Sequence, residues 1–391
     1  MSLPIRPRLA LLAFAHFTVD AYSSFFSPLL PLLVDKLHLS LTQVGSLVSL
    51  AAVASSFSQP LWGWVSDRLD RPWFIAFGPV VAAIFLSAIG LAPTYGTLIA
   101  LLMVGGIGVA SFHPQSAVLA GEIGKRRGVA MSIFITGGTL GFSLGPLFAV
   151  AVASRYGITH TWLAAIPGLI VSIVLTTWFL RVPARTRHIG GRPALAELKP
   201  VRRPLALLYF AVVSRSAVSY GFMTLLPLYL HAHSFSLTAG GTTVAIYSAL
   251  GALGGFAGGW LADRWGGRRV VMLSFLLSAP LYFGFLLVPG AGGLVLLVLG
   301  SFVLQSSLPV NVVMGQELSP RHSSTISSLL MGAAWGLGAL LIGPVGAISD
   351  RFGLAVGLGT LAAMTIVGFG CAVALPRVPR PLASSAPAFG S

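Results

Sequence analysis

The sequence predicts an all-α membrane protein with twelve transmembrane helices in two pseudo-symmetric six-helix bundles. Three observations lead to this prediction. Only 8% of the 391 residues are charged and 55% are hydrophobic, whereas a soluble domain carries about 25% charged residues. Twelve mostly apolar stretches of about 20 residues follow one another, each long enough to cross a hydrocarbon core of ~30 Å. The second half of the chain also repeats landmarks of the first half.

The apolar stretches define the predicted spans in chain order. Helices are expected because isolated strands cannot satisfy their backbone hydrogen bonds in lipid. A β-barrel would need polar residues that alternate toward a lumen, and these runs do not alternate. Pro28 and Pro31 should bend the outer part of the first helix. We place the spans at residues 9–34, 43–65, 72–92, 97–120, 128–153, 160–181, 205–231, 238–262, 269–288, 292–317, 323–348 and 354–375.

The internal repeat is visible at four pairs of landmarks with nearly constant separation. The pairs, 195 to 198 residues apart, are Gly63–Arg68 with Gly259–Arg264, Glu122 with Glu317, Pro114 with Pro309, and Gly145-Pro146 with Gly343-Pro344. Both halves have six spans and the same sidedness, so the repeats are parallel. We divide the chain into an N-terminal bundle (1–181), a cytoplasmic linker (182–204), a C-terminal bundle (205–375) and a cytoplasmic tail (376–391).

The net charge of +15 is explained by membrane topology. Twenty of the 24 Lys and Arg residues fall on the side of the two termini, whereas Lys36, Arg155 and Arg351 fall on the other side. By the positive-inside rule, both termini are cytoplasmic and the protein is a multi-pass protein of the inner (cytoplasmic) membrane. Membrane lipid is therefore the expected partner of the basic surface, and nucleic acid is not.

Enzyme chemistry finds little support in the sequence. There is no phosphate-cradling P-loop, so ATP is not the expected energy source. Cys371 is the single cysteine, which excludes an internal disulfide. No group of His, Cys and Asp has metal-site spacing along the chain, and no cofactor or metal is expected. We expect a monomer that handles a small-molecule substrate.

The repeat and its loop motif resemble the major facilitator superfamily. The G-x-x-x-D-R pattern at Gly63–Arg68 and Gly259–Arg264 is similar to that family's loop motif, with a fuller second copy that runs to Arg269. The glycine pattern from Gly137 to Pro146 resembles the fifth helix of the family's antiporters. The resemblance implies a transporter that works by alternating access, with the first and seventh helices lining a central cavity.

A narrower resemblance is to the fosmidomycin-resistance branch of bacterial drug exporters. It is carried by four segments, His16–Asp20, Phe57–Gly63, Phe112–Ser116 and Gly137–Pro146. The resemblance implies proton-driven export, and the branch's namesake substrate is a small phosphonate antibiotic. In one respect the chain departs from the family. The arginine that many family antiporters place in the fourth helix is missing, and His113 is the ionisable residue deep in that span.

Four ionisable residues lie deep inside predicted spans, namely His16, Asp20, His113 and Arg215. An ionisable group there costs about 2.5–3.5 kcal/mol, so it indicates function. At 1.5 Å per residue, Asp20 and Arg215 lie roughly 16 and 15 Å deep, near the midplane. They are 195 positions apart and therefore equivalent in the repeat. His16 lies one turn from Asp20 on the same face. His113 corresponds to Leu308, so it breaks the symmetry.

These residues suggest distinct roles. Proton coupling is assigned to Asp20, whose carboxyl group would take up a proton in a dry site and release it as charges reorganise nearby, and to His16 and His113, whose imidazoles titrate near neutral pH. Arg215 supplies a fork-shaped positive charge for a carboxylate or phosphonate. Further substrate-binding residues are expected to be Asp20, His113, Gln115, Tyr22, Tyr220, Gln305 and Asn311. Gating is expected of the charged residues at the cytoplasmic helix ends, Asp67, Arg68, Asp263, Arg264, Arg268, Glu122, Arg126, Glu317 and Arg321.

Structural alternatives remain open for most of these residues. Asp20 and Arg215 could form a static ion pair between the two halves. His16 and His113 could simply donate to helix carbonyls, and Gln305 and Asn311 could join helices by hydrogen bonds. The charged residues at the helix ends could be structural salt bridges. Glycine runs such as Gly251–Gly259 and Gly332–Gly338 are predicted to let helices approach and slide.

The predicted function is therefore that of a secondary active transporter, a proton-coupled exporter of a small organic anion or drug. An alternative is uptake or facilitated diffusion of a metabolite by the same fold. A third hypothesis is a non-transporting membrane sensor. The sequence disfavours it, because it shows no soluble domain that would receive a signal.

Overall fold

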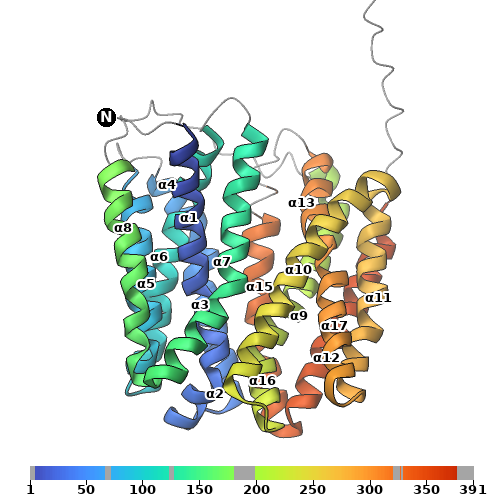
Figure 1. Ribbon diagram of the computed structural model, residues 1–391. Coiled ribbons are helices and arrows are strands. Elements are labelled where there is room, and N and C mark those ends of the chain that lie inside the picture. Colours follow the sequence, from blue (N-terminus) through green and yellow to red (C-terminus); the bar gives the residue numbers. More distant parts are fainter. Residues whose placement is uncertain are drawn as a thin grey trace, which may run out of the picture.

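The computed structural model describes residues 5–66, 72–122, 127–179, 199–319, 326 and 329–376. Within these ranges the regular secondary structure is helical, and twelve helices are long and apolar enough to cross a membrane. The helices run side by side in one bundle, with α1 to α8 on one side and α9 to α17 on the other (Figure 1). The predicted twelve-helix fold class is confirmed, and the described spans agree with the predicted ones to within a few residues, apart from the seventh, which starts at Lys199. The predicted start of the eleventh span lies outside the described residues.

The first six spans are built from the following elements. They are α1 (Ile5–Ser23), α2 (Phe26–Leu37), α3 (Leu41–Ala52), the π-helical turn η1 (Val53–Phe57), α4 (Gln59–Ser66), α5 (Trp73–Ser87), η2 (Ala88–Leu91), α6 (Tyr95–Glu122), α7 (Arg127–Tyr156), η3 (Ile158–Ala164) and α8 (Ala165–Phe179). Short 3₁₀ turns therefore end the third span and begin the sixth.

The last six spans have a similar construction. They are α9 (Arg202–Ala232), α10 (Leu237–Trp265), α11 (Gly267–Leu287), α12 (Gly290–Gln305), α13 (Ser307–Leu318), the π-helical turn η6 (Leu329–Ala333), α15 (Ala334–Leu340), α16 (Ile342–Phe352) and α17 (Leu354–Ala374). Helix α9 begins at Arg202, so the helix extends slightly into the predicted linker.

Prolines explain where three spans are interrupted. Pro28 has no N–H to donate to the carbonyl of Ser24, and the first span is broken between Ser23 and Phe26. The bend predicted for this span is thereby confirmed. The same effect applies to two other spans. Pro309 cannot donate to the carbonyl of Gln305, where α12 ends, and Pro344 cannot donate to that of Leu340, where α15 ends.

Helix α1 packs closely against α7 through glycines. A Cβ atom on Gly137, Gly141 or Gly145 would overlap with the backbone of α1 at Ala13, Phe17 and Ala21, respectively. The three glycines are four residues apart, so they lie on one face of α7. Their lack of side chains allows two helix backbones to approach in a bilayer. The glycine pattern seen in the sequence therefore fixes α1, which carries two of the buried ionisable residues.

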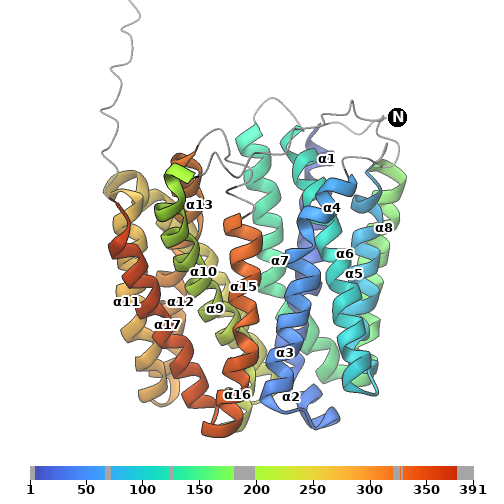
Figure 2. The same cartoon turned by 180° about the vertical axis from the view of Figure 1, so that it is seen from behind.

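The two halves meet at the end of the bundle opposite Ile5, where α3 lies against α15 and α16 (Figure 2). A Cβ atom on Gly45 would overlap with the backbone of Ile342, and one on Gly346 with that of Leu41. The backbones of the two halves are therefore in close contact at this end.

A carboxylate reinforces this contact. Asp350 Oδ1 accepts from the Leu41 N–H at 2.7 Å, and Oδ2 accepts from the Thr42 N–H at 2.8 Å. The Thr42 hydroxyl also donates to Oδ2 at 2.5 Å. The first N–H groups of α3 have no partner within their own helix, and the positive end of the helix dipole favours an acid there. Asp350 of one half thus caps a helix of the other half.

We expect Asp350→Ala to weaken closure at this end. Loss of a helix N-cap costs about 0.5–2 kcal/mol, which shifts a two-state equilibrium by about 2- to 30-fold. Spin labels at His38→Cys and Phe352→Cys, in a Cys371→Ser background, would show a larger population of long distances in electron-spin resonance.

The matched control is Asp35→Ala. Asp35 faces His231 across the same boundary at 3.7 Å, but the two side chains are 66% and 50% exposed. Exposed ion pairs contribute little, about 0–1 kcal/mol, so this change should have the smaller effect. Equal distance distributions for Asp350→Ala and the unmodified protein would show that Asp350 does not hold the halves together.

Candidate functional site

Three of the predicted residues meet on the inner face of the N-terminal half. His16 Nε2 lies 3.2 Å from Asp20 Oδ2, and His113 Nε2 lies 3.1 Å from Asp20 Oδ1. His16 and Asp20 are one turn apart on α1, whereas His113 comes from α6. The Asp20 carboxylate therefore bridges two imidazole rings, and we call these three residues the His–Asp–His cluster.

The other ring nitrogen of each histidine contacts a backbone carbonyl. His16 Nδ1 lies 2.8 Å from the Phe134 oxygen on α7, and His113 Nδ1 lies 2.7 Å from the Val109 oxygen. A carbonyl can only accept, so each Nδ1 must carry the proton. Both histidines thus donate to helix carbonyls, as the structural alternative proposed, and both also direct Nε2 toward Asp20.

This arrangement fixes how many protons the cluster can hold. With the Nδ1 protons in place, each Nε2···Oδ contact is a hydrogen bond only if one further proton lies between the two atoms. The cluster can therefore accept two protons, one at each contact. Without them, the lone pairs of Nε2 and of the carboxylate face each other, and the cluster carries one negative charge.

The surroundings hold the cluster in place while leaving part of it open. The ring of His16 stacks on that of Phe134 at 4.1 Å between centroids, and His16 is 7% exposed. A Cβ atom on Gly138 would lie 2.6 Å from Asp20 Oδ2 and would overlap with the His16 ring. The side chains of Asp20 and His113 remain 18% and 25% exposed, so small species can reach them.

A second polar centre surrounds Arg215 on α9, in the C-terminal half. Its guanidinium donates to Gln305 Oε1 at 2.7 Å and to Ser216 Oγ at 3.1 Å, and lies 5.5 Å from the centre of the Trp335 ring. Arg215 is 3% exposed, and its Nε has no hydrogen-bond partner in the described part of the chain. One donor of a buried cation is therefore unused among the described residues.

Three tyrosines lie in the field of Arg215, and one asparagine of the same half is buried without partners within the ranges that the structure describes. Tyr220 lies within electrostatic range of both Arg215 and Asp20. The hydroxyls of Tyr247 and Tyr282 are 3.1 Å apart, and both tyrosines also lie in the field of Arg215. Asn311 is fully buried, and neither polar atom of its side chain has a partner among the described residues. Because buried polar groups are normally hydrogen-bonded, Asn311 stands out as a group with unused donors and acceptors.

Asp20 and Arg215 do not form the static ion pair that the sequence left open. Within the described residues, the ionic partners of Asp20 are His16 and His113. Arg215 is bound by Gln305 and Ser216 instead. The acid and the base therefore each have their own partners, one set in each half of the chain.

Two residues predicted to bind substrate are used as structural links. The Tyr22 hydroxyl donates to the Ala164 carbonyl at 2.6 Å and accepts from the Gly168 N–H at 2.9 Å, which joins α1 to η3 and α8. Gln115 Oε1 accepts from the first N–H groups of α5, at Phe74 and Ile75. Both side chains are buried in these roles, so we leave them out of the site.

The residues predicted to act in gating are only partly described. Asp67, Arg68, Arg126 and Arg321 lie outside the described residues, as does the side chain of Glu122. Asp263 and Glu317 are exposed, and Arg264 lies 3.5 Å over the Trp260 ring. Arg268 donates to the carbonyls of Val373 and Leu375, which tie α11 to the end of α17 within the same half.

Some contributors to the site were missed by sequence reasoning. The carbonyls of Phe134 and Val109 fix the histidine tautomers, but a backbone carbonyl has no sequence signature. Trp335 lies in a glycine-rich run, and nothing in that run indicated that its ring would face Arg215. The absence of metal-site spacing in the sequence was also misleading. Asp20 and His113 are 93 residues apart, yet the structure brings three potential ligand atoms within 4.8 Å of one another.

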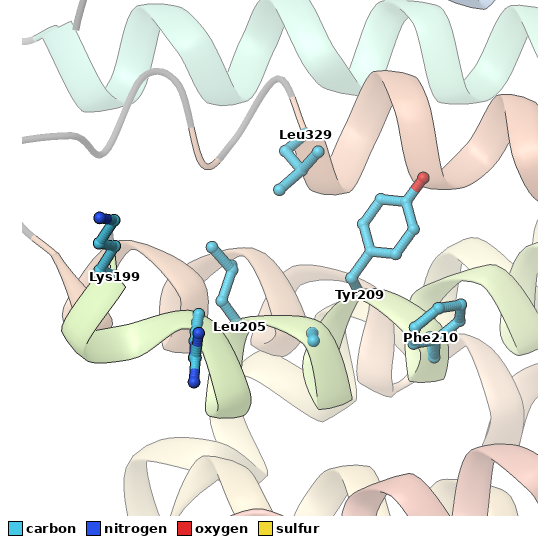
Figure 3. Close-up of a pocket in the computed structure, with 7 residues that line it drawn as sticks. Lys199, Leu205, Tyr209, Phe210 and Leu329 are labelled. Atoms are coloured by element: carbon cyan, nitrogen blue, oxygen red, sulfur yellow. The ribbon is translucent and has the colours of Figure 1, made fainter. Parts of the chain in front are cut away.

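A separate cavity of about 350 Å³ lies near the start of α9 (Figure 3). Lys199 and Arg202 stand at its rim, and the apolar side chains of Leu205, Phe210 and Leu329 line it, together with Tyr209. None of the predicted substrate or proton residues belongs to this lining. The two polar centres therefore remain the candidate functional site.

Curated relatives cover nearly the whole chain. The chain is 29% identical to the fosmidomycin resistance protein of Escherichia coli (strain K12) over 357 residues, which are 88% of this chain and 86% of that protein. It is 29% identical to the uncharacterized MFS-type transporter YfnC of Bacillus subtilis (strain 168) over 377 residues, 93% of this chain and 91% of that protein.

Solved structures share the fold at low sequence identity. A bacterial homolog of the human lysosomal transporter Spinster, in an inward-facing and occupied conformation, superimposes with a TM-score of 0.80 at 17% identity, covering 95% of this chain and 97% of the other. The nucleoside transporter NupG gives a TM-score of 0.78 at 17% identity, covering 95% and 99%. The family model described as Major Facilitator Superfamily matches residues 12–343, and the chain belongs to this superfamily of transporters.

Proposed function

We propose that the protein exports small organic anions across the inner membrane in exchange for protons, by alternating access. The observation that carries this proposal is the separation of two charge centres. The His–Asp–His cluster has places for two protons in one half. Arg215 has an unused buried donor in the other half. A site with these parts can take up protons and an anion at different atoms.

The Arg215 centre is suited to an anion for chemical reasons. A guanidinium presents donors in a planar fork that matches a carboxylate or phosphonate. Gln305 and Trp335 orient the group, and Tyr220, which lies in the field of both centres, is well placed to sense occupancy of either. Asn311 would supply both a donor and an acceptor to polar parts of the substrate.

The contact between the halves supports an inward-facing state. The halves are in close contact at the end opposite Ile5, through α3, α16 and the Asp350 cap. The bias of Lys and Arg places the termini in the cytoplasm. The closed end would then face outward, in keeping with the inward-facing conformation named for the bacterial homolog of Spinster. We further propose that the charged helix ends at Asp263, Arg264 and Glu317 take part in closing the cytoplasmic side.

The direction of transport is inferred from the relatives. The similar proteins include one named for fosmidomycin resistance and several named multidrug resistance protein MdtG. Resistance is most simply obtained by export. We therefore assign an outward direction to the anion and an inward direction to the proton, with a monomer as the transporting unit.

Inverted membrane vesicles test this function directly. With the interior acidified by respiration, vesicles that contain the protein should accumulate radiolabelled fosmidomycin against its gradient, and a protonophore should abolish the accumulation by collapsing both the pH difference and the membrane voltage. Vesicles without the protein are the control. Accumulation that resists the protonophore would exclude proton coupling. Equilibration without accumulation would favour a facilitator, and transport confined to lipophilic cations would exclude the anion.

A further inference from the structure

We propose that His16 Nε2, His113 Nε2 and a carboxylate oxygen of Asp20 form a binding site for a divalent transition-metal ion, with Zn²⁺ as the representative. The site uses the atoms that the proposed function assigns to protons, so a bound metal ion and those protons exclude each other. Zn²⁺ would therefore act as an inhibitor of transport.

The spacing of the three residues is close to that of a metal site. Their ligand atoms all lie within 4.8 Å of one another, and the two Nε2···Oδ distances are 3.2 and 3.1 Å. Zinc bound at ~2.0–2.1 Å in tetrahedral geometry sets neighbouring ligand atoms ~3.3 Å apart. The two distances are to different oxygens of Asp20, so one edge of the required tetrahedron is present for either oxygen. A small rotation of the carboxylate and a small approach of the two histidine rings would complete the other two.

The outer contacts of the histidines are those that metal sites require. A metal-bound imidazole almost always donates its other N–H to a carbonyl or carboxylate, which fixes the tautomer and the ring orientation. His16 Nδ1 has the Phe134 carbonyl and His113 Nδ1 has the Val109 carbonyl. In both rings the Nε2 lone pair is consequently directed at the position that a metal ion would occupy.

The ligand types select the class of ion. Two imidazoles and one carboxylate suit zinc, iron, nickel or copper, whereas magnesium and calcium prefer oxygen ligands alone. Three protein ligands leave a fourth position open. Since Asp20 and His113 are 18% and 25% exposed at the side chain, a water molecule or a substrate oxygen can fill that position.

The packing around the cluster supports a preformed site. The His16 ring is stacked on Phe134, and Gly138 leaves no space between α7 and the cluster for a side chain. The pair of His231 and Asp35 provides a contrast on the same molecule. It has two ligands only, at 3.7 Å and with side chains 50% and 66% exposed, so we expect it to bind metal ions weakly.

Titration of the purified full-length protein, carrying an affinity tag without histidine, with Zn²⁺ and with Co²⁺ tests the proposal. We expect one strong site per chain by calorimetry and the visible absorption of tetrahedral Co²⁺. Changing an outer contact typically weakens metal binding by about 10- to 100-fold, so removing a ligand by His113→Gln or His16→Gln should weaken it about 100-fold or more.

The control variant is His231→Gln, which should keep the strong site and the Co²⁺ spectrum. Melting curves without metal verify that each variant is folded. Binding that survives in the His16→Gln and His113→Gln double variant, or that is lost in His231→Gln, would overturn the assignment. Metal binding is measured without transport, so a protein that binds no metal ion could still pass the vesicle experiment. Conversely, a protein whose transport proves independent of protons could still bind the metal ion.

Discussion

Asp20→Asn is expected to abolish accumulation of substrate driven by a pH gradient. Asparagine keeps the size of the side chain and can still contact both Nε2 atoms, but it cannot exchange a proton. The amide nitrogen can donate to one Nε2 without a further proton, and the neutral amide oxygen holds a proton at the other Nε2 less firmly than a carboxylate does, so the coupling is lost while the Arg215 centre is unchanged. Accumulation in acidified inverted vesicles should fall to the level of vesicles without the protein.

Binding and exchange separate this effect from misfolding. Asp20→Asn should still bind the anion and should still exchange labelled for unlabelled substrate at equal concentrations on both sides. Asp35→Asn is the matched control, because Asp35 is also an acid near a histidine but is 66% exposed at the side chain. It should accumulate substrate normally. Undiminished accumulation by Asp20→Asn would show that the coupling proton is held elsewhere.

Arg215→Gln is expected to remove anion recognition. Hydrogen bonds to charged groups contribute about 1.5–3 kcal/mol each, so the loss of the one at Nε predicts a decrease in affinity of about 10- to 150-fold. Arg215→Lys should recover part of the affinity at most, since an ammonium keeps the charge but loses the planar fork. Substrate binding to purified protein and resistance of expressing cells would both report the change.

The control for Arg215 is an arginine outside both centres. Arg155 is exposed and lies 6.0 Å from the centre of the Tyr156 ring, so Arg155→Gln should leave substrate affinity unchanged. Melting curves should distinguish loss of the site from loss of the fold, because Arg215 is buried. An Arg215→Gln protein that binds the anion with wild-type affinity would place recognition at another cation.

Much of the fold follows from the sequence because the lipid allows few solutions. Long apolar runs specify helices, and Pro28 specifies the break in the first span. The meeting of His16 and Asp20 also follows from local geometry, since residues four apart lie on one helical face. His113 joins them only because α6 is rotated so that this side chain faces α1. The depth of His113 in the membrane does not specify that rotation.

The contacts that the sequence could not specify have a common physical cause. Tyr22 and Gln115 were expected to face the substrate, but their partners are backbone groups of other helices. Gln305 was expected to line the cavity wall, but its hydrogen bond to Arg215 was not foreseen. Each of these outcomes depends on the rotation and offset of one helix against another. Those quantities are set by tertiary packing, in which small residues such as Gly137 and Gly141 decide how closely helices approach.

The separation of Asp20 from Arg215 has an electrical consequence. In the proposed exchange, each proton that moves inward and each monoanion that moves outward adds one positive charge to the inward transfer, so a one-for-one exchange transfers two positive charges inward per cycle. Each charge that crosses a potential of 100 mV, negative inside, contributes about 2.3 kcal/mol. Two charges contribute ~4.6 kcal/mol, which corresponds to a concentration ratio of roughly 2,000 at 25 °C. A cell could therefore keep such an anion out by its membrane voltage, even with little difference in pH.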